Sequence, residues 1–457
     1  MLPGTYQTFF QRIQKQIPSE QLIIDPLRTV AFGADASFYR LVPKIVINVN
    51  NEQEVQLILR EAGRLRLPVT FRAAGTSLSG QAITDSILVR LGPGWNRWRV
   101  FDNAAKIQLQ PGIIGSQANR ILAEFDRKIG PDPASIDSAK IGGILANNAS
   151  GMCCGVEQNS YRTLDSMRII LADGTVVDTG DDKSKAACRR SHPALVDGLT
   201  AMCDRVRADA ELSERIRYKF KIKNTTGYSL NALIDFTDPF DVMQHLMIGS
   251  EGTLGFIADV VYRTVIEHRH KASALIFYPD IRTVCEAVVA LQRQPVAAAE
   301  LIDRAGLASV AGKPGMPPFL AELDPPVTAL LIETRAESAA ALASQIEQIT
   351  AGLAHLPTVR PIEFTAVPEE FNQLWKVRKG LFPAVGAVRR TGTTVIIEDV
   401  AFPIEHLADA TLDLQELFRK YDYTEAIIFG HALAGNLHFV FTQDFSIQQE
   451  EIGRAHV

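Results

Sequence analysis

The chain has 457 residues and a net charge of −5, and 46% of its residues are hydrophobic. Its length predicts two or three domains with sizeable cores, and mixed charges without a basic tract argue against nucleic acid as a partner. The start, from Met1 to Phe10, lacks the basic and then apolar pattern of a secretion signal, and no apolar run approaches the roughly 18 residues of a membrane span.

Strand and helix patterns alternate over the first part of the chain. Hydrophobic periodicity predicts an amphipathic helix at 52–65 and strands at 44–49, 69–71, 87–91 and 107–109. A helix is predicted from Gly115 to Asp126, and two apolar runs around Asp173-Gly174 predict a hairpin. We therefore expect a small α+β unit over residues 44–112, followed by a second part.

After Val265 the pattern changes to longer units. The sequence predicts strands at 272–278 and 327–333 and helices at 281–292 and 338–350. This alternation is typical of an antiparallel sheet covered by helices, as in ferredoxin-like folds.

Three segments consist almost wholly of small and hydroxyl residues. The first is Phe71-Arg-Ala-Ala-Gly-Thr-Ser-Leu-Ser-Gly80, which follows a predicted strand. Its glycines let the backbone approach an anion and its hydroxyls add donors, although an ordinary Gly/Ser connector is equally compatible with it. The second runs from Pro131-Asp-Pro-Ala-Ser135 to Ile141-Gly-Gly-Ile-Leu-Ala-Asn-Asn-Ala-Ser-Gly151, and the third is Gly249-Ser-Glu-Gly-Thr-Leu-Gly255.

Together with Lys223-Asn-Thr-Thr-Gly-Tyr228, these segments resemble, in this order, the FAD-binding domain of the vanillyl-alcohol oxidase type. The resemblance is to the branch that oxidises D-2-hydroxy acids, above all to D-lactate dehydrogenases in which a flavin portion is fused to an iron-sulfur portion. It covers nearly the whole chain. It implies an α+β fold: a two-part FAD-binding domain at 1–265, divided into about 40–112 and 113–265, and a ferredoxin-like cap domain at 266–450 that is incomplete.

The resemblance also implies which residues contact FAD. They are Arg72, Ala73, Ala74, Gly75, Thr76, Ser77, Ser79, Gly80, Pro131, Asp132, Ser135, Gly142, Gly143, Asn147, Asn148, Ser150, Gly151, Glu251, Gly252, Gly255 and Ile257. Because the loop at 72–80 contains neither His nor Cys, we expect FAD to be bound non-covalently. No G-x-G-x-x-G follows a strand, so a nicotinamide dinucleotide fold is not supported.

Two histidines mark a candidate metal site in Gly430-His-Ala-Leu-Ala-Gly-Asn-Leu-His438. On a regular strand, His431 and His438 would lie on opposite faces, but the glycines allow a bend that turns both toward one point. Such a pair suits zinc or a similar divalent ion, and hydrogen-bonded core histidines are about as compatible with the pattern. The family pattern Gly-His-x-Gly-Asp-Gly-Asn-x-His implies the metal, although Leu433-Ala434 depart from it here.

Binding of a substrate carboxylate calls for a cation that can donate two parallel hydrogen bonds, as the guanidinium group of arginine does. The run Leu374-Trp-Lys-Val-Arg378 resembles the family's W-x-x-R motif, which implies that Arg378 binds this carboxylate, while an exposed arginine on a helix is the alternative. Glu398 lies within an apolar run that predicts a strand. The sequence is equally compatible with a Glu398 side chain near the site and with one on the exposed face of that strand. The family's third metal ligand and base lie in a downstream Ala-Glu-His-Gly motif that this sequence lacks.

The expected reaction is oxidation of D-lactate to pyruvate, with removal of a hydride to FAD and catalytic roles for Arg378, His431 and His438. The resemblance implies that electrons then pass to an iron-sulfur domain and on to a cytochrome or quinone. D-2-hydroxyglutarate dehydrogenase is the alternative within this class, and a flavin-binding module without turnover is the alternative outside it.

The end of the chain and its cysteines bear on completeness and location. Glu451-Ile-Gly-Arg-Ala-His-Val457 matches the translation of a common sequencing adapter, so we expect the natural protein to continue beyond Glu450, with the iron-sulfur part in the missing region. Cysteines without C-x-x-C spacing suit a reducing compartment, and we expect a cytoplasmic protein with peripheral attachment at the inner membrane face left open. The pair Cys153-Cys154 is interpreted as packing rather than as a flavin-site pair.

Overall fold

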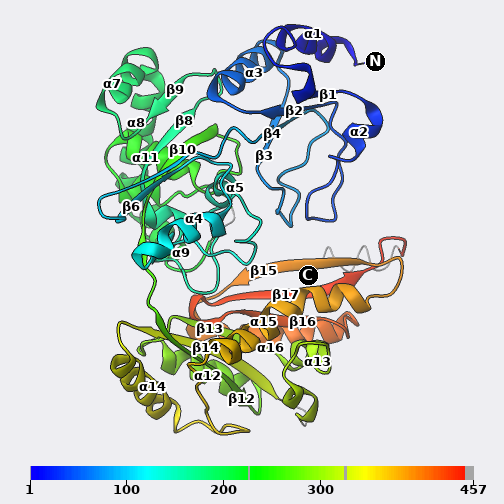
Figure 1. Cartoon of the computed structure of the whole chain (residues 1–457), viewed down its shortest axis with the longest axis vertical. Helices are drawn as coiled ribbons and strands as arrows, with labels where there is room; N and C mark the ends of the chain where they lie inside the picture. The colour runs from blue at the N-terminus through cyan, green and yellow to red at the C-terminus, as the bar shows by residue number, and fades with distance from the viewer. Residues whose placement is uncertain (1, 225–226, 324–326, 448–457) are drawn as a thin grey trace. The chain divides into compact units, whose positions relative to one another are not determined.

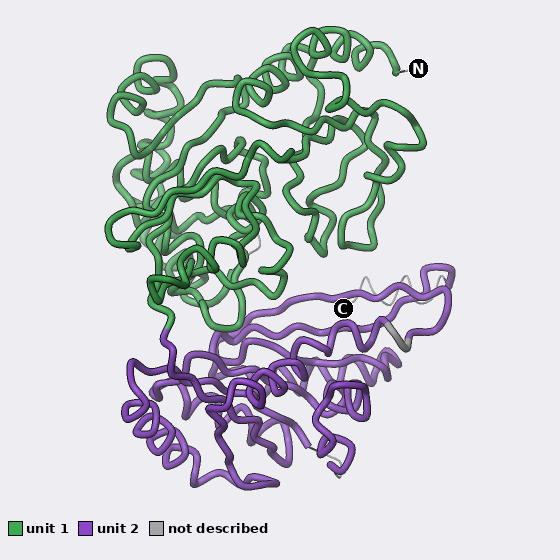
Figure 2. Tube along the Cα trace, viewed as in Figure 1, with its two compact units in different colours: residues 1–267 green, residues 268–457 purple. Residues whose placement is uncertain are grey.

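The computed structural model describes residues 2–224, 227–323 and 327–447. The contacts divide the chain into two compact units, Met1–Glu267 and His268–Val457 (Figures 1 and 2). Two predicted features lie outside the described residues in whole or in part: the adapter-like segment 451–457, and positions 225 and 226 of the Lys223–Tyr228 motif.

The first sheet of unit 1 has the strand order β1-β2-β4-β3. Its strands are β1 (Leu22–Ile23), β2 (Ile45–Val49), β3 (Val69–Arg72) and β4 (Ile87–Leu91). Strands β2, β4 and β3 are parallel, so their carboxyl ends, including the start of the loop at 72–80, lie at one edge. This places the predicted anion-binding loop where ligands of parallel sheets commonly bind.

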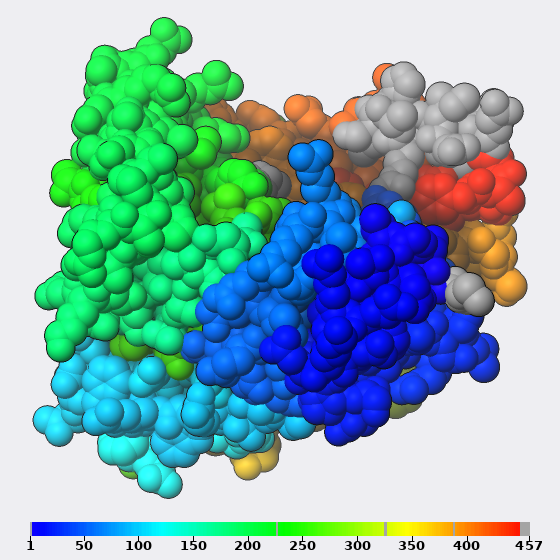
Figure 3. All heavy atoms as spheres, turned by 90° about the horizontal axis from the view of Figure 1, so that it is seen from above, coloured from blue at the N-terminus to red at the C-terminus, as the bar shows by residue number. Residues whose placement is uncertain are grey.

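Helix α3 (Glu52–Leu65) covers one face of this sheet, with the bounds that the periodicity predicts. The Asn51 side chain accepts a hydrogen bond from the Glu54 backbone N–H and starts the helix, and Val55 and Ile58 are buried against the sheet. Helix α1 (Gly4–Ile13) packs on α3, and the N-terminal residues form part of the outer surface of unit 1 in Figure 3. The short η1 (Ser19–Gln21) and α2 (Pro26–Val30) complete this part.

The second sheet of unit 1 is antiparallel, with the order β5-β6-β10-β8-β9. Its strands are β5 (Trp98–Phe101), β6 (Lys106–Leu109), β8 (Leu164–Ile170), β9 (Val176–Asp178) and β10 (Phe256–Arg263). The hairpin at Asp173-Gly174 is confirmed, and Gly174 has a φ of 83°. The strand predicted at 107–109 belongs to this sheet rather than to the first α+β unit, because β6 pairs with β10 and a period-2 pattern does not reveal a strand's partner.

Helices and one small ribbon surround the second sheet. The helix predicted at 115–126 ends earlier, at Leu122, and continues as a 3-10 turn to Phe125, because Asp126 adopts a left-handed φ of 54°. The ribbon pairs β7 (Arg127–Lys128) with β11 (Val265–Ile266). The helices are α4 (Gly115–Leu122), η2 (Ala123–Phe125), α5 (Ile141–Asn147), α6 (Ser160–Thr163), α7 (Asp182–Ser191), α8 (Pro193–Ala208), α9 (Ala210–Lys219), α10 (Ala232–Asp235) and α11 (Pro239–Met247).

Unit 2 is built on one antiparallel sheet with the order β12-β14-β13-β16-β17-β15. Its strands are β12 (His270–Tyr278), β13 (Ala298–Ile302), β14 (Thr328–Ala336), β15 (Thr394–Ala401), β16 (Ile427–His431) and β17 (Asn436–Gln443). The strands and helices predicted between 272 and 350 are present, with bounds that differ by a few residues. An antiparallel sheet with helices is therefore confirmed for this region.

Helices cover both faces of this sheet. On one face, Val377 and Leu381 of α15 (Pro368–Val388) join a core with Phe429 and Val440 of the central strands. On the other, Leu342 of α14 (Ala339–Leu353) packs on residues of β12 and β14. The remaining helices are α12 (Ile281–Leu291), α13 (Arg304–Val310), η3 (Pro318–Glu322), η4 (Ile404–His406), α16 (Leu407–Lys420) and η5 (Ala432–Ala434).

None of the helices within the described ranges combines the length and apolarity that crossing a bilayer requires.

Candidate active site

The three small-residue segments predicted to bind FAD meet around α5 in unit 1. A Cβ added at Gly143 would lie 3.5 Å from the Cβ of Ala73, so α5 packs directly on the loop at 72–80. On the same helix, Asn147 donates from Nδ2 to Glu251 Oε1 at 2.7 Å, and the Glu251 backbone N–H donates to the Ala146 carbonyl. Segments that are far apart in sequence are thus assembled into one surface lined by small residues.

The loop at 72–80 is closed by Arg72. Its Nε and Nη2 donate to the Ala82 carbonyl at 2.7 and 2.5 Å and tie the two ends of the loop together. Gly75 and Gly80 both have a φ of 76°, a conformation that L-residues rarely adopt. Within the turn, the Ser77 hydroxyl accepts from the Ser79 backbone N–H at 3.2 Å. Ala73, Ala74 and Thr76 occupy the rest of this turn.

Asp132 anchors the chain that leaves α5. Its carboxylate accepts backbone hydrogen bonds from Gly151 at 3.1 Å, Cys153 at 2.9 Å and Cys154 at 3.2 Å. A Cβ at Gly151 would lie 1.7 Å from the Asp132 carbonyl oxygen, so only glycine fits there. Burial, helped by the Asp132 charge, raises the pKa of Cys154 to about 12, which fits a packed thiol rather than a reactive thiolate.

The other predicted FAD contacts differ in whether their side chains already have a partner within the protein. The buried hydroxyl of Ser150 has no hydrogen-bond partner among the described residues, as expected of a group that awaits a ligand. The Oδ1 atom of Asn148 already has a partner, since it accepts from the Tyr161 backbone N–H at 3.3 Å. Ile257 packs in the hydrophobic core, so only its backbone could face a cofactor.

The remaining predicted positions are held by local packing. Gly142 faces Pro111, Gly252 faces Phe71, Gly255 faces the Ile170 carbonyl, Pro131 is buried, and the Ser135 carbonyl accepts from the backbone of Ser138 and Ala139. These residues lie in the segments that meet around α5 or directly beside them. The assembled small residues and the unpartnered Ser150 hydroxyl fit FAD, while each individual contact with FAD stays a prediction.

In unit 2 the two histidines do converge. Strand β16 ends at His431, η5 follows, Gly435 turns the chain with a φ of 61°, and β17 carries His438 back beside β16. Their Nε2 atoms lie 3.2 Å apart, and the ring planes are nearly perpendicular at 87°. The glycine-assisted bend that the sequence suggests is therefore present.

A carboxylate holds each histidine from its other nitrogen. His431 Nδ1 lies 2.6 Å from Glu300 Oε1, and His438 Nδ1 bonds Asp399. An ionised carboxylate can only accept, so each histidine donates a proton from Nδ1, and both Nε2 atoms point toward one place. Two ligands about 2.0–2.1 Å from a tetrahedral zinc ion are about 3.3 Å apart, close to the observed separation. Within the described ranges, however, no group of three or more His, Cys, Asp or Glu side chains could hold a metal.

Arg378 reaches the same cluster from α15. Its Nε donates to Glu300 Oε2 at 2.5 Å, and its guanidinium lies 4.3 Å from the centre of the Phe429 ring. The residue is only 8% exposed, so the alternative of an exposed helix arginine is wrong. Its two terminal nitrogens have no hydrogen-bond partner among the described residues, which leaves the fork free for a carboxylate.

The charges in this cluster follow from burial and pairing. Burial alone would raise the pKa of Glu300, but the adjacent His431 and Arg378 charges and hydrogen bonds outweigh it and hold that pKa at about 2. Burial lowers the pKa of His438 to about 4, against the opposing effect of Asp399, so at neutral pH His438 is neutral and its Nε2 can only accept, facing His431 Nε2. The cluster therefore places a carboxylate-binding cation beside two imidazoles, of which His438 is neutral at neutral pH.

Sequence reasoning missed both carboxylates. Glu300 is an acid inside Ala298–Ile302, a strand of five buried residues, and that contrast with its neighbours could have drawn attention to it. Glu398, which the sequence left open, is exposed on β15, and the adjacent Asp399, which is also exposed, contacts His438 instead. A one-residue difference moves a strand side chain to the opposite face.

Comparison with known families agrees with this arrangement. The family described as "FAD binding domain" matches residues 43–180, and "FAD linked oxidases, C-terminal domain" matches residues 267–455. The two matches and the fold together support a class: the chain contains an FAD-binding domain and a C-terminal domain of the FAD-linked oxidase type, as flavin-dependent oxidoreductases do.

The names of individual relatives give different substrates. The chain is 25% identical to a D-2-hydroxyglutarate dehydrogenase of Pantoea ananatis over 95% of its own length and 44% of that protein. It is 24% identical to the glycolate oxidase subunit GlcD of Bacillus subtilis, covering 90% of this chain and 76% of that one. It is also 24% identical to a mitochondrial D-lactate dehydrogenase [cytochrome] of Arabidopsis thaliana, covering 91% and 63%. The chain thus spans less than half of the D-2-hydroxyglutarate dehydrogenase.

Solved structures support the fold. An alkyldihydroxyacetonephosphate synthase superposes with a TM-score of 0.68 at 14% identity, covering 99% of this chain and 79% of that one. The p-cresol methylhydroxylase superposes with a TM-score of 0.67 at 13% identity, covering 99% and 86%. The predicted α+β fold of the vanillyl-alcohol oxidase type is confirmed.

Proposed function

We propose that this protein oxidises a short D-2-hydroxy acid, with D-lactate as the first candidate and pyruvate as its product. The observation that carries the proposal is the buried cluster of Arg378, Glu300, His431 and His438 in unit 2. A 2-hydroxy acid offers a carboxylate and an adjacent hydroxyl, and the cluster offers a free guanidinium fork beside two imidazole nitrogens. Relatives named for lactate, glycolate and 2-hydroxyglutarate support this substrate class.

Each residue has a defined task in this proposal. Arg378 binds the substrate carboxylate through its terminal nitrogens, while Glu300 fixes the guanidinium through Nε. The Nε2 atoms of His431 and His438 face the hydroxyl, either directly as proton acceptors or by holding a divalent ion such as zinc that polarises it. FAD, when bound, accepts the hydride of the α-carbon.

The electron route is part of the proposal as well. Two relatives are named D-lactate dehydrogenase [cytochrome], which supports an acceptor other than nicotinamide. We propose that electrons leave through an iron-sulfur domain to a cytochrome or quinone. Iron analysis of the protein purified from its native source, with reduction of cytochrome c or a quinone by D-lactate, tests this step.

The substrate is tested by mixing the FAD-loaded protein with hydroxy acids in the absence of air. Bleaching of the flavin absorbance by D-lactate, at a rate at least tenfold above that with L-lactate, is the expected result. Arg378→Met should remove most of the bleaching, whereas Lys379→Met, an exposed neighbour on the same helix, should leave it unchanged. If FAD binds but stays oxidised with every hydroxy acid, the chain is a flavin-binding module and the proposed reaction is wrong.

D-2-hydroxyglutarate is the second candidate, because three relatives that align with nearly the whole chain are named D-2-hydroxyglutarate dehydrogenase. Its second carboxylate would need a second cation. The same anaerobic assay with both acids at equal concentration separates the candidates, since the preferred substrate gives the larger ratio of bleaching rate to half-saturating concentration.

A further inference from the structure

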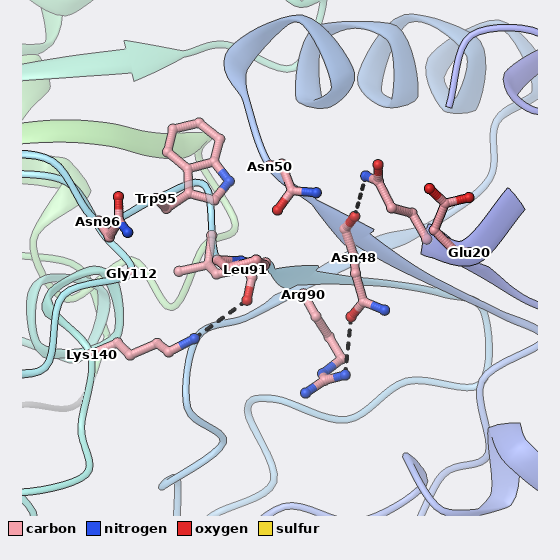
Figure 4. Close-up of a pocket in the computed structure, with 12 residues that line it drawn as sticks. Glu20, Asn48, Asn50, Arg90, Leu91, Trp95, Asn96, Gly112 and Lys140 are labelled. Carbon is pink, nitrogen blue, oxygen red and sulfur yellow. Dashed lines mark hydrogen bonds between the residues drawn. The ribbon is translucent and has the colours of Figure 1, made fainter. Parts of the chain in front are cut away.

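A cavity of about 560 Å³ in unit 1 is lined by charged side chains that are not among the proposed FAD contacts (Figure 4). It lies at the end of β4 and the segment before α5. Two cations line it, Arg90 at the end of β4 and Lys140 directly before α5, and neither is among the residues predicted from the sequence. The other lining groups include the amides of Gln21, Asn48, Asn50 and Asn96 and the acid Glu20.

Both cations have neutral partners. Arg90 Nη1 donates to Asn48 Oδ1 at 3.0 Å, and its guanidinium lies 4.5 Å from the centre of the Phe32 ring. Lys140 Nζ donates to the Leu91 carbonyl at 3.3 Å. Figure 4 shows both side chains on the same side of β4. Among the described residues, neither forms an ion pair with a carboxylate, although half-buried cations ordinarily do.

A third cation extends this positive region to the loop at 72–80. Arg72 is the register partner of Arg90 on the neighbouring parallel strand, so both side chains lie on one face of the sheet. Burial lowers the pKa of Lys140, and the Arg90 charge lowers it further. Burial is also the main cause of the lowered pKa of Arg72; the nearby Asp35 carboxylate opposes this shift, and the Arg90 charge adds to it. The field of the three cations therefore favours an anion at the shared edge of β3 and β4.

We propose that Arg90 and Lys140 bind the pyrophosphate of FAD in this cavity. The pyrophosphate carries two negative charges, which match the two cations that lack a carboxylate partner. The amide-lined cavity is large enough for the phosphates and part of the sugar chain but smaller than the whole cofactor. The inference adds to FAD binding by this unit and does not depend on which hydroxy acid is oxidised.

The test compares FAD affinity among full-length variants freed of flavin, measured by quenching of flavin fluorescence. Lys140→Gln keeps a donor for the Leu91 carbonyl but removes the charge, and Lys140→Arg keeps the charge. Lys44→Gln is the matched control, because Lys44 Nζ also donates to a backbone carbonyl, that of Asp85, and does not line the cavity. Each variant is titrated at low and high ionic strength, about 0.02 M and 0.5 M, because salt screens exposed phosphate contacts.

At low salt we expect Lys140→Gln to raise the Kd of FAD about tenfold, since a hydrogen bond between charged groups is lost. Lys140→Arg should stay within about threefold of the wild type and Lys44→Gln within about twofold, and the Lys140→Gln effect should shrink at high salt. Wild-type affinity in Lys140→Gln, or a loss of affinity that salt does not change, would overturn the inference while FAD binding itself stands. Failure of the wild type to bind FAD would instead overturn the proposed function.

Discussion

Replacing Glu300 by Gln should damage both the stability of unit 2 and its histidine site. The carboxylate is fully buried and accepts from Arg378 Nε at 2.5 Å and His431 Nδ1 at 2.6 Å. Removing one partner of a buried ion pair typically destabilises a protein by about 3–5 kcal/mol, because the other charge stays buried without compensation. We expect a loss of this size in the free energy of unfolding of unit 2, measured by urea denaturation.

The same substitution should weaken metal binding through the imidazole tautomer. An amide that accepts from Arg378 can only donate toward His431, which places the His431 proton on Nε2 and blocks ligation there. Loss of such a partner typically lowers metal affinity about 10–100-fold. Zinc titration by calorimetry measures this effect, and Asp399→Asn is the matched variant for the more exposed partner of His438.

Two outcomes would refute this reasoning. If Glu300→Gln loses less than about 1 kcal/mol of stability, the ion pair with Arg378 does not persist in solution. If it binds zinc as tightly as the wild type while Asp399→Asn does not, the tautomer of His431 is not set by Glu300.

Three further changes test other parts of the structure. Gly151→Ala should abolish FAD binding and lower the melting temperature, because its Cβ would collide with the Asp132 carbonyl. Gly143→Ala should keep the melting temperature and weaken only FAD binding. Equal effects of the two variants in both assays would contradict this prediction. Burial lowers the pKa of His245 from 6.5 to about 4, so this histidine stays neutral in the folded protein. The stability that it contributes is fully present above pH 6.5, and about 3 kcal/mol of it is lost as the pH falls from 6.5 through 4. His245→Gln should flatten urea-unfolding stability between pH 6.5 and 4, and an unchanged slope would be inconsistent with this origin. Arg378→Lys should raise KM for the hydroxy acid at least tenfold with a smaller change in kcat, since a point charge replaces a fork, and unchanged steady-state kinetics would argue against carboxylate binding there.

Much of the local structure could be predicted from the sequence, because it depends on local signals. The helix at Glu52–Leu65 has a capping Asn51 and a clear amphipathic period, and Asp173-Gly174 marks its hairpin directly. The convergence of His431 and His438 could also be anticipated, because Gly435 lies between them. These features need no knowledge of distant parts of the chain.

The missed residues depend on long-range strand pairing. Glu300 is 131 positions from His431 in sequence and contacts it because β13 and β16 are neighbours in the sheet. Arg90 and Lys140 come together only after β4 and the segment before α5 have been placed in one unit. Hydrophobic periodicity identifies strands but not their partners, so sequence reasoning could select Arg378 by resemblance and could not supply its carboxylate.

The strand order β13-β16-β17-β15 affects how this site can change during evolution. Glu300 is the register partner of His431, and Asp399 is the register partner of His438. The two histidines are diagonal neighbours offset by two positions, so the polar residues form a stepped row across four adjacent strands. Backbone hydrogen bonds hold such a row at the strand spacing of about 4.8 Å without help from loops. Loops around it can therefore lengthen, shorten or change composition and so alter substrate preference, while the reactive row keeps its geometry.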